Sequence, residues 1–129
     1  MLLVIFLSLV LIESKTFFTV GPKKYQLDVQ HCYEQDGDVA IPLASDLNDI
    51  LQACGQEPCY VGLHRAFHGS PDFVTVKFEK MTESIPWNTN EPDNAGGYED
   101  CVKVVNVNGL AKLEDWPCTG ESKAVCVRN

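Results

Sequence analysis

Apolar residues recur at helical spacing in two stretches of the first half of the chain. The first runs from Tyr25 to Tyr33, with apolar side chains at positions i, i+4, i+7 and i+8, and stops at Asp36-Gly37-Asp38. The second follows Ser45, which we expect to be its N-cap, and ends at Gly55, a residue suited to closing a helix. The pattern therefore predicts two short amphipathic helices.

β-Branched and aromatic residues gather in short runs that predict strands. These runs are Thr16–Val20, Cys59–Leu63, Phe73–Phe78, Cys101–Val107, Leu110–Leu113 and Ala124–Val127. Gly21-Pro22 should close the first strand, which we expect to pair with the last. Asn108-Gly109 is a strong hairpin signal and should reverse the chain between two antiparallel strands. Because the helices come early and most strands late, the predicted class is α+β.

The amino-terminal residues Met1 to Ile12 are almost wholly apolar. This run is too short to span a bilayer and is typical of a secretory signal peptide. No basic residue precedes it, so an uncleaved anchor or a buried strand are the alternatives. We interpret residues 1–14 as a signal peptide cut near Ser14, followed by one secreted domain over residues 16–129, without membrane insertion.

Charge narrows the range of partners for this domain. With 10 basic and 18 acidic residues, the 129-residue chain has a net charge of −8. An acidic chain without a basic patch is a poor partner for nucleic acid or for an anionic membrane. Cations and neutral ligands suit it better.

The six cysteines, an even number behind a predicted signal peptide, indicate three disulfides formed in an oxidising compartment. Sequence alone leaves their pairing open. The cysteines are not grouped as close metal-ligand pairs, which argues against zinc. His64 and His68 are four residues apart but adjoin Gly69-Ser70-Pro71, so we interpret them as part of a surface loop.

Acidic side chains are concentrated between Trp87 and Cys118, among Pro, Gly and Asn residues that favour ordered loops. The six carboxylates are Glu91, Asp93, Glu99, Asp100, Glu114 and Asp115. Glu99 comes just before the predicted hairpin, and Glu114-Asp115 should follow its second strand, so both ends should meet. Ca²⁺ takes six to eight oxygen ligands, and this concentration of carboxylates predicts a site for it.

The acidic motifs of this stretch resemble those of the C-type lectin-like domain, and the chain as a whole resembles its short form. The similarity rests on Glu91-Pro92-Asp93, on Glu99-Asp100-Cys101 and on Glu114-Asp115 before Cys118. It implies two helices packed on small antiparallel sheets, a long loop region and a cis Pro92. It also implies the disulfides Cys32–Cys126 and Cys101–Cys118, which leaves Cys54–Cys59 as a third.

The same resemblance implies a ligand set. The Ca²⁺ ligands would be Glu91, Asp93, Glu99, Glu114 and Asp115, with the Asp115 carbonyl as a further oxygen, and the first four would also contact sugar hydroxyls. Without a cation these carboxylates would repel one another, so Ca²⁺ should order the loop. An auxiliary Ca²⁺ site of the family lacks its acidic residues around Arg65, and we expect it to be absent.

The predicted function is that of a Ca²⁺-dependent carbohydrate-binding protein. The resemblance leaves open whether the sugar is of mannose or galactose type, because Glu91-Pro92-Asp93 combines the Glu-Pro of the first type with the terminal Asp of the second. Ionised carboxylates only accept hydrogen bonds, so the usual amide donors to the sugar are missing unless Asn88, Asn90 or Asn94 supplies them. A protein or other non-sugar partner is therefore the alternative, and an acidic solvated loop is the third interpretation. Homo-oligomers would strengthen a weak sugar site by avidity.

Glycosidase chemistry by Glu91 and Glu99 is a formal further alternative, because paired carboxylates can act as acid and base. No Ser-His or Cys-His constellation supports catalysis. We therefore predict a binding protein rather than an enzyme.

Overall fold

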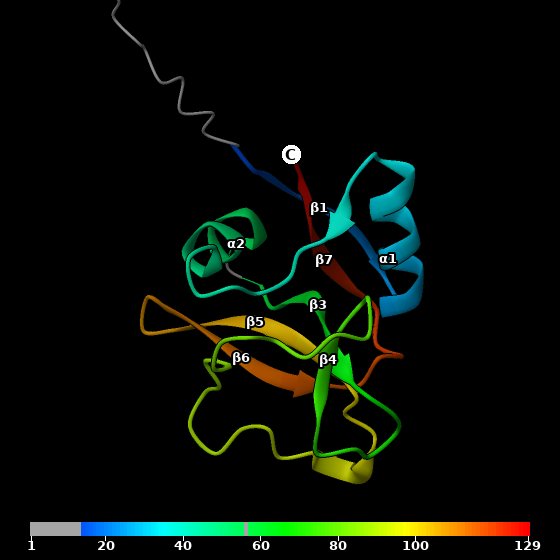
Figure 1. The fold of residues 1–129 in the computed structure, drawn as a ribbon, viewed down its shortest axis with the longest axis vertical. Coiled ribbons are helices and arrows are strands. Elements are labelled where there is room, and N and C mark those ends of the chain that lie inside the picture. Colours follow the sequence, from blue (N-terminus) through cyan, green and yellow to red (C-terminus); the bar gives the residue numbers. More distant parts are fainter. Residues whose placement is uncertain (1–13, 56) are drawn as a thin grey trace, which may run out of the picture.

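A single sheet path, β1-β7-β3-β5-β6, runs through the domain, with β2 beside β7 and β4 beside β3 (Figure 1). The computed structural model describes residues 14–55 and 57–129, so the predicted signal peptide lies almost entirely outside the described residues. The elements are β1 Thr16–Lys23, α1 Tyr25–Glu34, β2 Asp38–Val39, α2 Leu47–Cys54, β3 Cys59–Arg65, β4 Phe73–Thr75, β5 Cys101–Val107, β6 Leu110–Trp116 and β7 Ser122–Arg128.

The pairing is antiparallel except at β3 and β7, which run parallel and meet at Tyr60 and Ala124. This parallel contact joins the pair formed by β1 and β7 to the β5–β6 hairpin, which makes one mixed sheet. The α+β class predicted from the sequence is confirmed. Within the described ranges, no helix has both the length and the apolar character needed to cross a membrane.

The first and last strands lie side by side, as predicted, with Thr16 opposite Arg128 (Figure 1). β1 does not stop at Gly21-Pro22 but continues through an irregular step and pairs again at Lys23. Gly21 makes this step possible because its φ is 92°, a conformation that other residues rarely adopt. A Cβ atom there would also lie 2.5 Å from Asp28 Oδ1.

Both predicted helices form, but the predicted start of the second is wrong. α2 begins at Leu47 with Asp46 rather than Ser45 as its N-cap, and no side chain caps its free N–H groups. The Asp46 carboxylate instead pairs with Lys15 Nζ at 2.8 Å. Gly55 follows α2 with φ 81°, in keeping with its predicted role at the helix end.

Two strand boundaries differ from the predictions, and both lie next to the segments that carry the acidic residues. β4 ends at Thr75 because a turn follows, in which Phe78 N donates to Thr75 O at 2.8 Å. β6 continues to Trp116, which pairs with Cys101. Glu114 and Asp115 therefore lie within the strand rather than after it, which fixes their backbone in the ladder.

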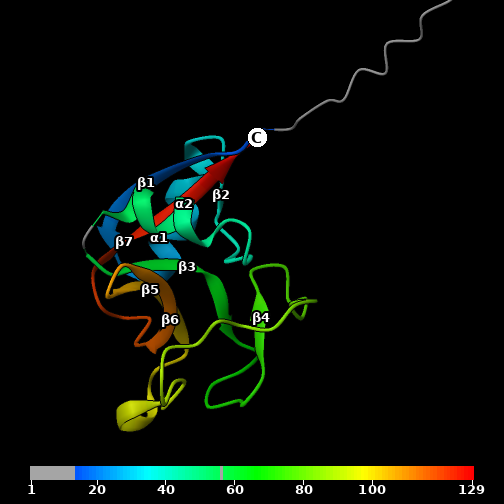
Figure 2. The same ribbon diagram turned by 90° about the vertical axis from the view of Figure 1, so that its left-hand side faces the viewer.

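Two apolar clusters fill the faces of the sheet. One packs α2 against β3, β5 and β6 through residues that include Ile50, Val61, Leu63, Val104 and Leu113. The other packs α1 against β3 and β7 through Tyr25, Cys32, Val39, Tyr60 and Cys126. The helices thus cover the half of the molecule that is distant from the long loop after β4 (Figure 2).

All three implied disulfides are present, which confirms the predicted pairing. Cys32–Cys126 joins α1 to β7 across 94 residues, Cys101–Cys118 closes the base of the β5–β6 hairpin, and Cys54–Cys59 links α2 to β3. In the chain-entropy model the longest of these loops contributes most, about 4 to 5 kcal/mol. The Cys101–Cys118 bond holds the two ends of the acidic hairpin together.

A buried carboxylate, Asp28, belongs to α1. Its residue is fully buried, and neither of its oxygens has a hydrogen-bond partner of normal geometry. Burial raises the pKa of Asp28 to about 7, against the opposing effects of the Lys23 backbone and of the Lys23 and Lys103 charges. Lys103 is itself buried and lies over the rings of Tyr60 and Trp116, at 4.8 and 4.0 Å from their centroids.

Asp28→Asn should change how stability depends on pH. The folded-state pKa lies above that of a free Asp, so the folded protein binds an extra proton between about pH 4 and 7 and loses stability as the pH rises through that window. The variant should lack this loss and should be more stable at pH 8, on the order of 4 kcal/mol. Urea denaturation at pH 5 and pH 8 measures both. Glu121→Gln, at an exposed position, should keep the wild-type profile, and an unchanged profile in Asp28→Asn would contradict the assignment.

Candidate metal centre

The long loop between β4 and β5, residues 76–100, is called the acidic loop from here on. It is attached to the edge of β6. Asn88 N donates to Leu113 O at 2.8 Å, Leu113 N donates to Pro86 O at 3.0 Å, and Trp87 forms an isolated parallel bridge with Leu113. This attachment brings the Glu91-Pro92-Asp93 triplet over the β6 residues that follow Leu113. The loop lies at the end of the molecule opposite the helices (Figure 2).

Asparagine residues shape the loop around the triplet. Asn90 and Asn94 have φ values of 65° and 48°, in the left-handed region that asparagine tolerates better than most residues. The Asn94 carbonyl accepts from Gly97 N at 2.9 Å and closes a tight turn at Ala95–Gly97. The Glu91–Pro92 peptide bond is cis, as the resemblance implied.

Three carboxylates converge at this point. Each of Glu91, Asp93 and Asp115 offers an oxygen, and these oxygens all lie within 4.8 Å of one another. Asp115 is 2% exposed, Glu91 is partly buried and Asp93 is exposed. Glu91 Oε2 is buried and has no hydrogen-bond partner among the described residues. The cluster thus combines a fixed base with an accessible outer face.

Asp115 is the fixed member of the cluster. Its Oδ1 accepts from Asp93 N at 3.1 Å, and its Oδ2 accepts from Asn94 N at 2.8 Å and from Arg65 Nη2 at 2.7 Å. Burial alone would raise the pKa of Asp115, but hydrogen bonds from Glu91, from these two backbone groups and from Arg65 lower it below its usual range. Asp115 is therefore ionised while it holds the backbone of the triplet.

The neighbouring glutamates are under electrostatic strain. Burial, contact with Asp115 and the charges of Asp93, Asp115 and Glu114 raise the pKa of Glu91 to about 8. Burial and Asp93 raise the pKa of Glu99 to about 7, although the backbone N–H of Ala95 opposes the shift. Carboxylates that crowd one another in this way favour a bound cation, which replaces the repulsion with attraction. With the unpartnered Glu91 oxygen, this makes the donor set a fit for a hard divalent ion.

The other predicted site residues lie beside this group. Glu99 Oε1 accepts from Ala95 N at 2.8 Å, next to Asp93, and Glu114 Oε2 accepts from Asn88 Nδ2 at 2.8 Å. Asp100 points elsewhere, to His68 Nδ1 at 2.6 Å and Gly69 N at 3.1 Å. The structure thus brings three of the five predicted ligands together and places the remaining two on the flanks, and the ligand roles stay predictions.

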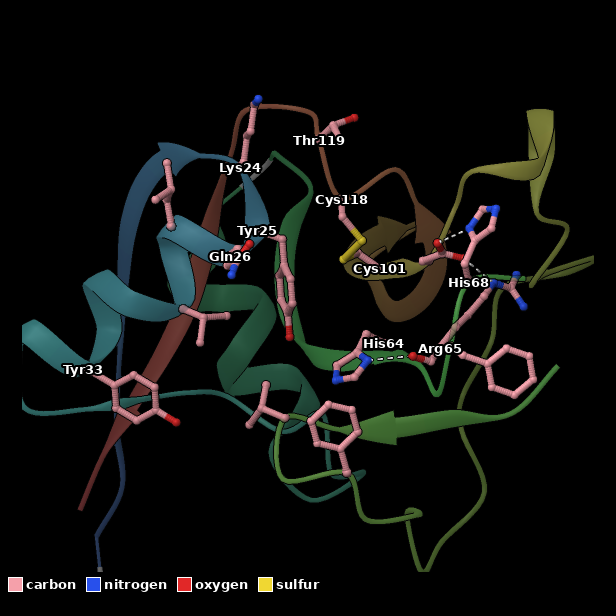
Figure 3. A pocket seen from close by; sticks show the side chains of 16 residues that line it. Lys24, Tyr25, Gln26, Tyr33, His64, Arg65, His68, Cys101, Cys118 and Thr119 are labelled. Carbon is pink, nitrogen blue, oxygen red and sulfur yellow. Dashed lines mark hydrogen bonds and ion pairs between the residues drawn. A yellow bond between two sulfur atoms is a disulfide. The ribbon is translucent and has the colours of Figure 1, made fainter. Parts of the chain in front are cut away.

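The two histidines do not converge (Figure 3). His64 belongs to β3 rather than to a loop, and its Nδ1 donates to Arg65 O at 2.7 Å. His68 lies in the following loop, where its ring stacks on Tyr98 with centroids 5.6 Å apart. Each imidazole therefore has a different partner, and the two rings do not face each other.

A hollow of about 570 Å³ lies beside α1 (Figure 3). Its walls are largely apolar and include Tyr25, Leu27, Phe78 and the Cys101–Cys118 disulfide. The three converging carboxylates Glu91, Asp93 and Asp115 do not line this hollow. The candidate ion site is therefore the carboxylate cluster rather than the hollow.

Sequence reasoning missed the contribution of Arg65, which it treated only as a position without an acidic ligand. The residue ends an apolar run that forms β3 and is 7% exposed. A buried arginine needs partners, and its place at the end of a buried strand was the signal available in the sequence. Its partner Asp115 comes from a strand fifty residues later in the chain.

The fold and this loop define a C-type lectin domain. Residues 22–128 match the family model of the lectin C-type domain, and the chain belongs to that family. The members of this family are binding proteins, so the prediction that the chain is not an enzyme is confirmed.

Individual proteins are similar to the chain in sequence or in fold. The chain is 32% identical to collectin-11 of Bos taurus over 104 residues, which are 75% of this chain and 38% of the relative, so it spans about two fifths of that protein's length. The C-type lectin domain of murine dendritic cell inhibitory receptor 2, solved in complex with N-glycan, superposes with a TM-score of 0.77 at 16% identity, covering 90% and 91% of the two chains. A Ca²⁺-dependent type II antifreeze protein in its Ca²⁺-free form gives 0.73 at 16% identity, with 92% and 95% covered.

Glu91→Gln should separate the metal-binding role of the cluster from its role in the fold. The change replaces a carboxyl whose ionisation its neighbours oppose with a neutral amide, so in chelator the variant should melt at or above the wild-type temperature. For the wild type, Ca²⁺ at about 100 times its Kd should add about 2.7 kcal/mol, which is a rise of several degrees. We expect at least half of that rise to be lost in Glu91→Gln and kept in Glu121→Gln, as measured by thermal melts. An equal rise in all three proteins would show that Glu91 does not bind the ion.

Proposed function

We propose that this chain is a secreted, Ca²⁺-dependent carbohydrate-binding protein whose site is the acidic loop. The convergence of Glu91, Asp93 and Asp115 oxygens within 4.8 Å on an exposed loop carries this proposal. Glu99 and Glu114, on the flanks, complete the ligand set. Secretion rests on the predicted signal peptide at residues 1–14.

Ca²⁺ suits this set because it takes six to eight hard oxygen ligands in flexible geometry. The five carboxylates and the Asp115 carbonyl can supply most of them. When bound, Ca²⁺ would neutralise the cluster and leave positions for oxygens of a ligand. Asp93 is exposed and Glu91 is only partly buried, so these positions would open to solvent.

Sugar recognition depends on what the chain offers to each hydroxyl. A hydroxyl bound to Ca²⁺ can donate its hydrogen to a carboxylate, and Glu91, Asp93, Glu99 and Glu114 are all acceptors. Its remaining lone pair needs a donor. Asn88 already gives its amide hydrogen to Glu114 at 2.8 Å, whereas Asn94 uses its Oδ1 to accept from Glu99 N at 3.0 Å. The Asn94 amide nitrogen is thus the better candidate donor.

Similar proteins support a glycan as the ligand. The murine receptor domain was solved with an N-glycan, and the relative from Bos taurus is a collectin. The acidic charge of the chain also suits a neutral ligand bound through a cation. Homo-oligomer formation would add avidity to a weak individual site.

A second candidate is Ca²⁺-dependent binding of a non-sugar partner. The observation that favours it is the all-carboxylate ligand set, beside which the Asn88 amide is already engaged by Glu114. Each unmet hydroxyl lone pair would cost about 1 to 3 kcal/mol, which is large for a shallow sugar site. The antifreeze protein of similar fold is an example of a Ca²⁺-dependent domain named for a different task.

Affinity resins test these two candidates. The protein is passed over mannose- and galactose-coupled resin in Ca²⁺ and then eluted with a chelator. We expect chelator-sensitive retention on one resin, lost in Glu91→Gln and kept in Glu121→Gln, because the ion bridges the loop and the sugar. No retention, together with a Ca²⁺-induced rise in melting temperature, would favour the non-sugar partner. If Ca²⁺ changes neither, the cluster is only an acidic surface.

Replacing acceptors with amides should improve sugar binding. The double variant Asp93→Asn with Glu114→Asn supplies two donors at positions next to the ion. Each new hydrogen bond is worth roughly 0.5 to 1.5 kcal/mol, so we expect affinity for the retained sugar to rise by about tenfold. Calorimetric titration with the free monosaccharide measures it. Unchanged affinity would count against the role given to the missing donors.

A further inference from the structure

Arg65 is the cation at the base of the acidic loop. It is the last residue of β3, and its side chain is only 5% exposed. Figure 3 shows the side chain pointing away from Tyr25, on the side of His68, while the Arg65 carbonyl faces His64. The guanidinium lies 4.6 Å from the centroid of Phe73, whose ring meets Trp87 at the root of the loop with centroids 4.8 Å apart.

Each nitrogen of the guanidinium binds a different segment. Nη2 donates to Asp115 Oδ2 at 2.7 Å in β6, Nε donates to Glu99 O at 2.9 Å, and Nη1 donates to Ser70 O at 2.6 Å. Asp100 Oδ1 lies 3.6 Å from Nε and adds a second acidic contact. One side chain thereby joins β3, the loop after it, the segment before β5 and the strand β6.

These contacts lead directly to the proposed ligands. Arg65 fixes Asp115, and Asp115 in turn accepts the backbone N–H groups of Asp93 and Asn94. Through its second bond Arg65 fixes the carbonyl of Glu99, whose own N–H donates to Asn94 Oδ1. Both ends of the segment 93–99 are therefore linked to the Arg65 guanidinium. Glu99 binds it directly, and Asp93 is connected to it through Asp115.

Electrostatics gives this charge a role that no other residue fills within residues 14–55 and 57–129. Arg65 alone among the described cations pairs with Asp115, and the other ion pairs involve Asp46 or Asp100. Asp115 is 2% exposed, and a buried carboxylate without a partner charge is strongly disfavoured. Removing Arg65 would leave this charge uncompensated among the other carboxylates of the loop.

We propose that Arg65 is a positioning residue whose guanidinium acts as a built-in cation and holds residues 93–99 in their binding conformation before Ca²⁺ binds. This inference rests on the proposed function. Arg65 orders the loop, and Ca²⁺ then binds to the ordered loop and contacts the ligand. A loop ordered in advance binds without the entropic cost of closing around the ion.

Hydrogen exchange tests the proposal at the amides of residues 93–99. In the wild type, removal of Ca²⁺ with a chelator should change their protection by less than about threefold, because Arg65 stays in place. In Arg65→Gln, protection in chelator should fall by more than about tenfold while amides of the β1–β7 pair keep theirs. Arg65→Lys keeps the charge but cannot reach three acceptors at once, so it should give an intermediate loss.

Matched controls separate this role from a general loss of stability. Arg128→Gln removes another arginine, one that lies over Phe18 and binds the carbonyls of Gln35 and Asp36, and it should leave the loop amides unchanged. Equal losses across the whole domain in Arg65→Gln would overturn the proposal. So would a wild-type loop that loses protection in chelator as far as the variant does.

The outcome also distinguishes this inference from the proposed function. If loop protection falls in Arg65→Gln and Ca²⁺ restores it, both stand. If protection falls in Arg65→Gln, and Ca²⁺ neither restores it nor raises the melting temperature of the wild type, the positioning role of Arg65 stands and the Ca²⁺ site is excluded. A loop equally protected in wild type and Arg65→Gln in chelator would overturn the role of Arg65 and leave the Ca²⁺ site intact.

Discussion

A buried charge must be paired, and in this domain the rule acts at Asp115. The carboxylate lies in a strand of the sheet, so its backbone is fixed by the ladder with β5. Its side chain accepts hydrogen bonds from Arg65 of β3 and from two backbone N–H groups of the long loop. The irregular loop takes one shape because these groups have a single fixed point to bind. The acidic cluster is thus an extension of the sheet rather than a free surface feature.

Local patterns predicted most of the elements because those elements follow from periodicity and turn chemistry. The Asn108-Gly109 turn and the strands beside it required only the sequence from Cys101 to Trp116. The start of α2 was misjudged because Ser45 and Asp46 are both good caps, and the ion pair of Asp46 with Lys15 decides what that side chain does. β2 was missed because two residues carry no pattern.

The acidic site was predicted by residue type and resemblance, but its internal order was not. Sequence spacing placed five carboxylates in one region: Glu91, Asp93, Glu99, Glu114 and Asp115. It could not show which of them bring their oxygens within 4.8 Å of one another. Arg65 was missed because its partner is distant in sequence, and pairing across such a distance is set by the sheet order. Asp28 was likewise missed, because its burial depends on how α1 packs against the sheet.

The antiparallel pairing of β1 with β7 places both ends of the domain at the same pole. Thr16 lies opposite Arg128, and the long loop with its carboxylates occupies the opposite pole (Figure 1). A surface, a tag or a neighbouring domain attached through either end would therefore stand behind the molecule and leave the loop facing outward. Several copies anchored side by side in this way would present their loops as a single array.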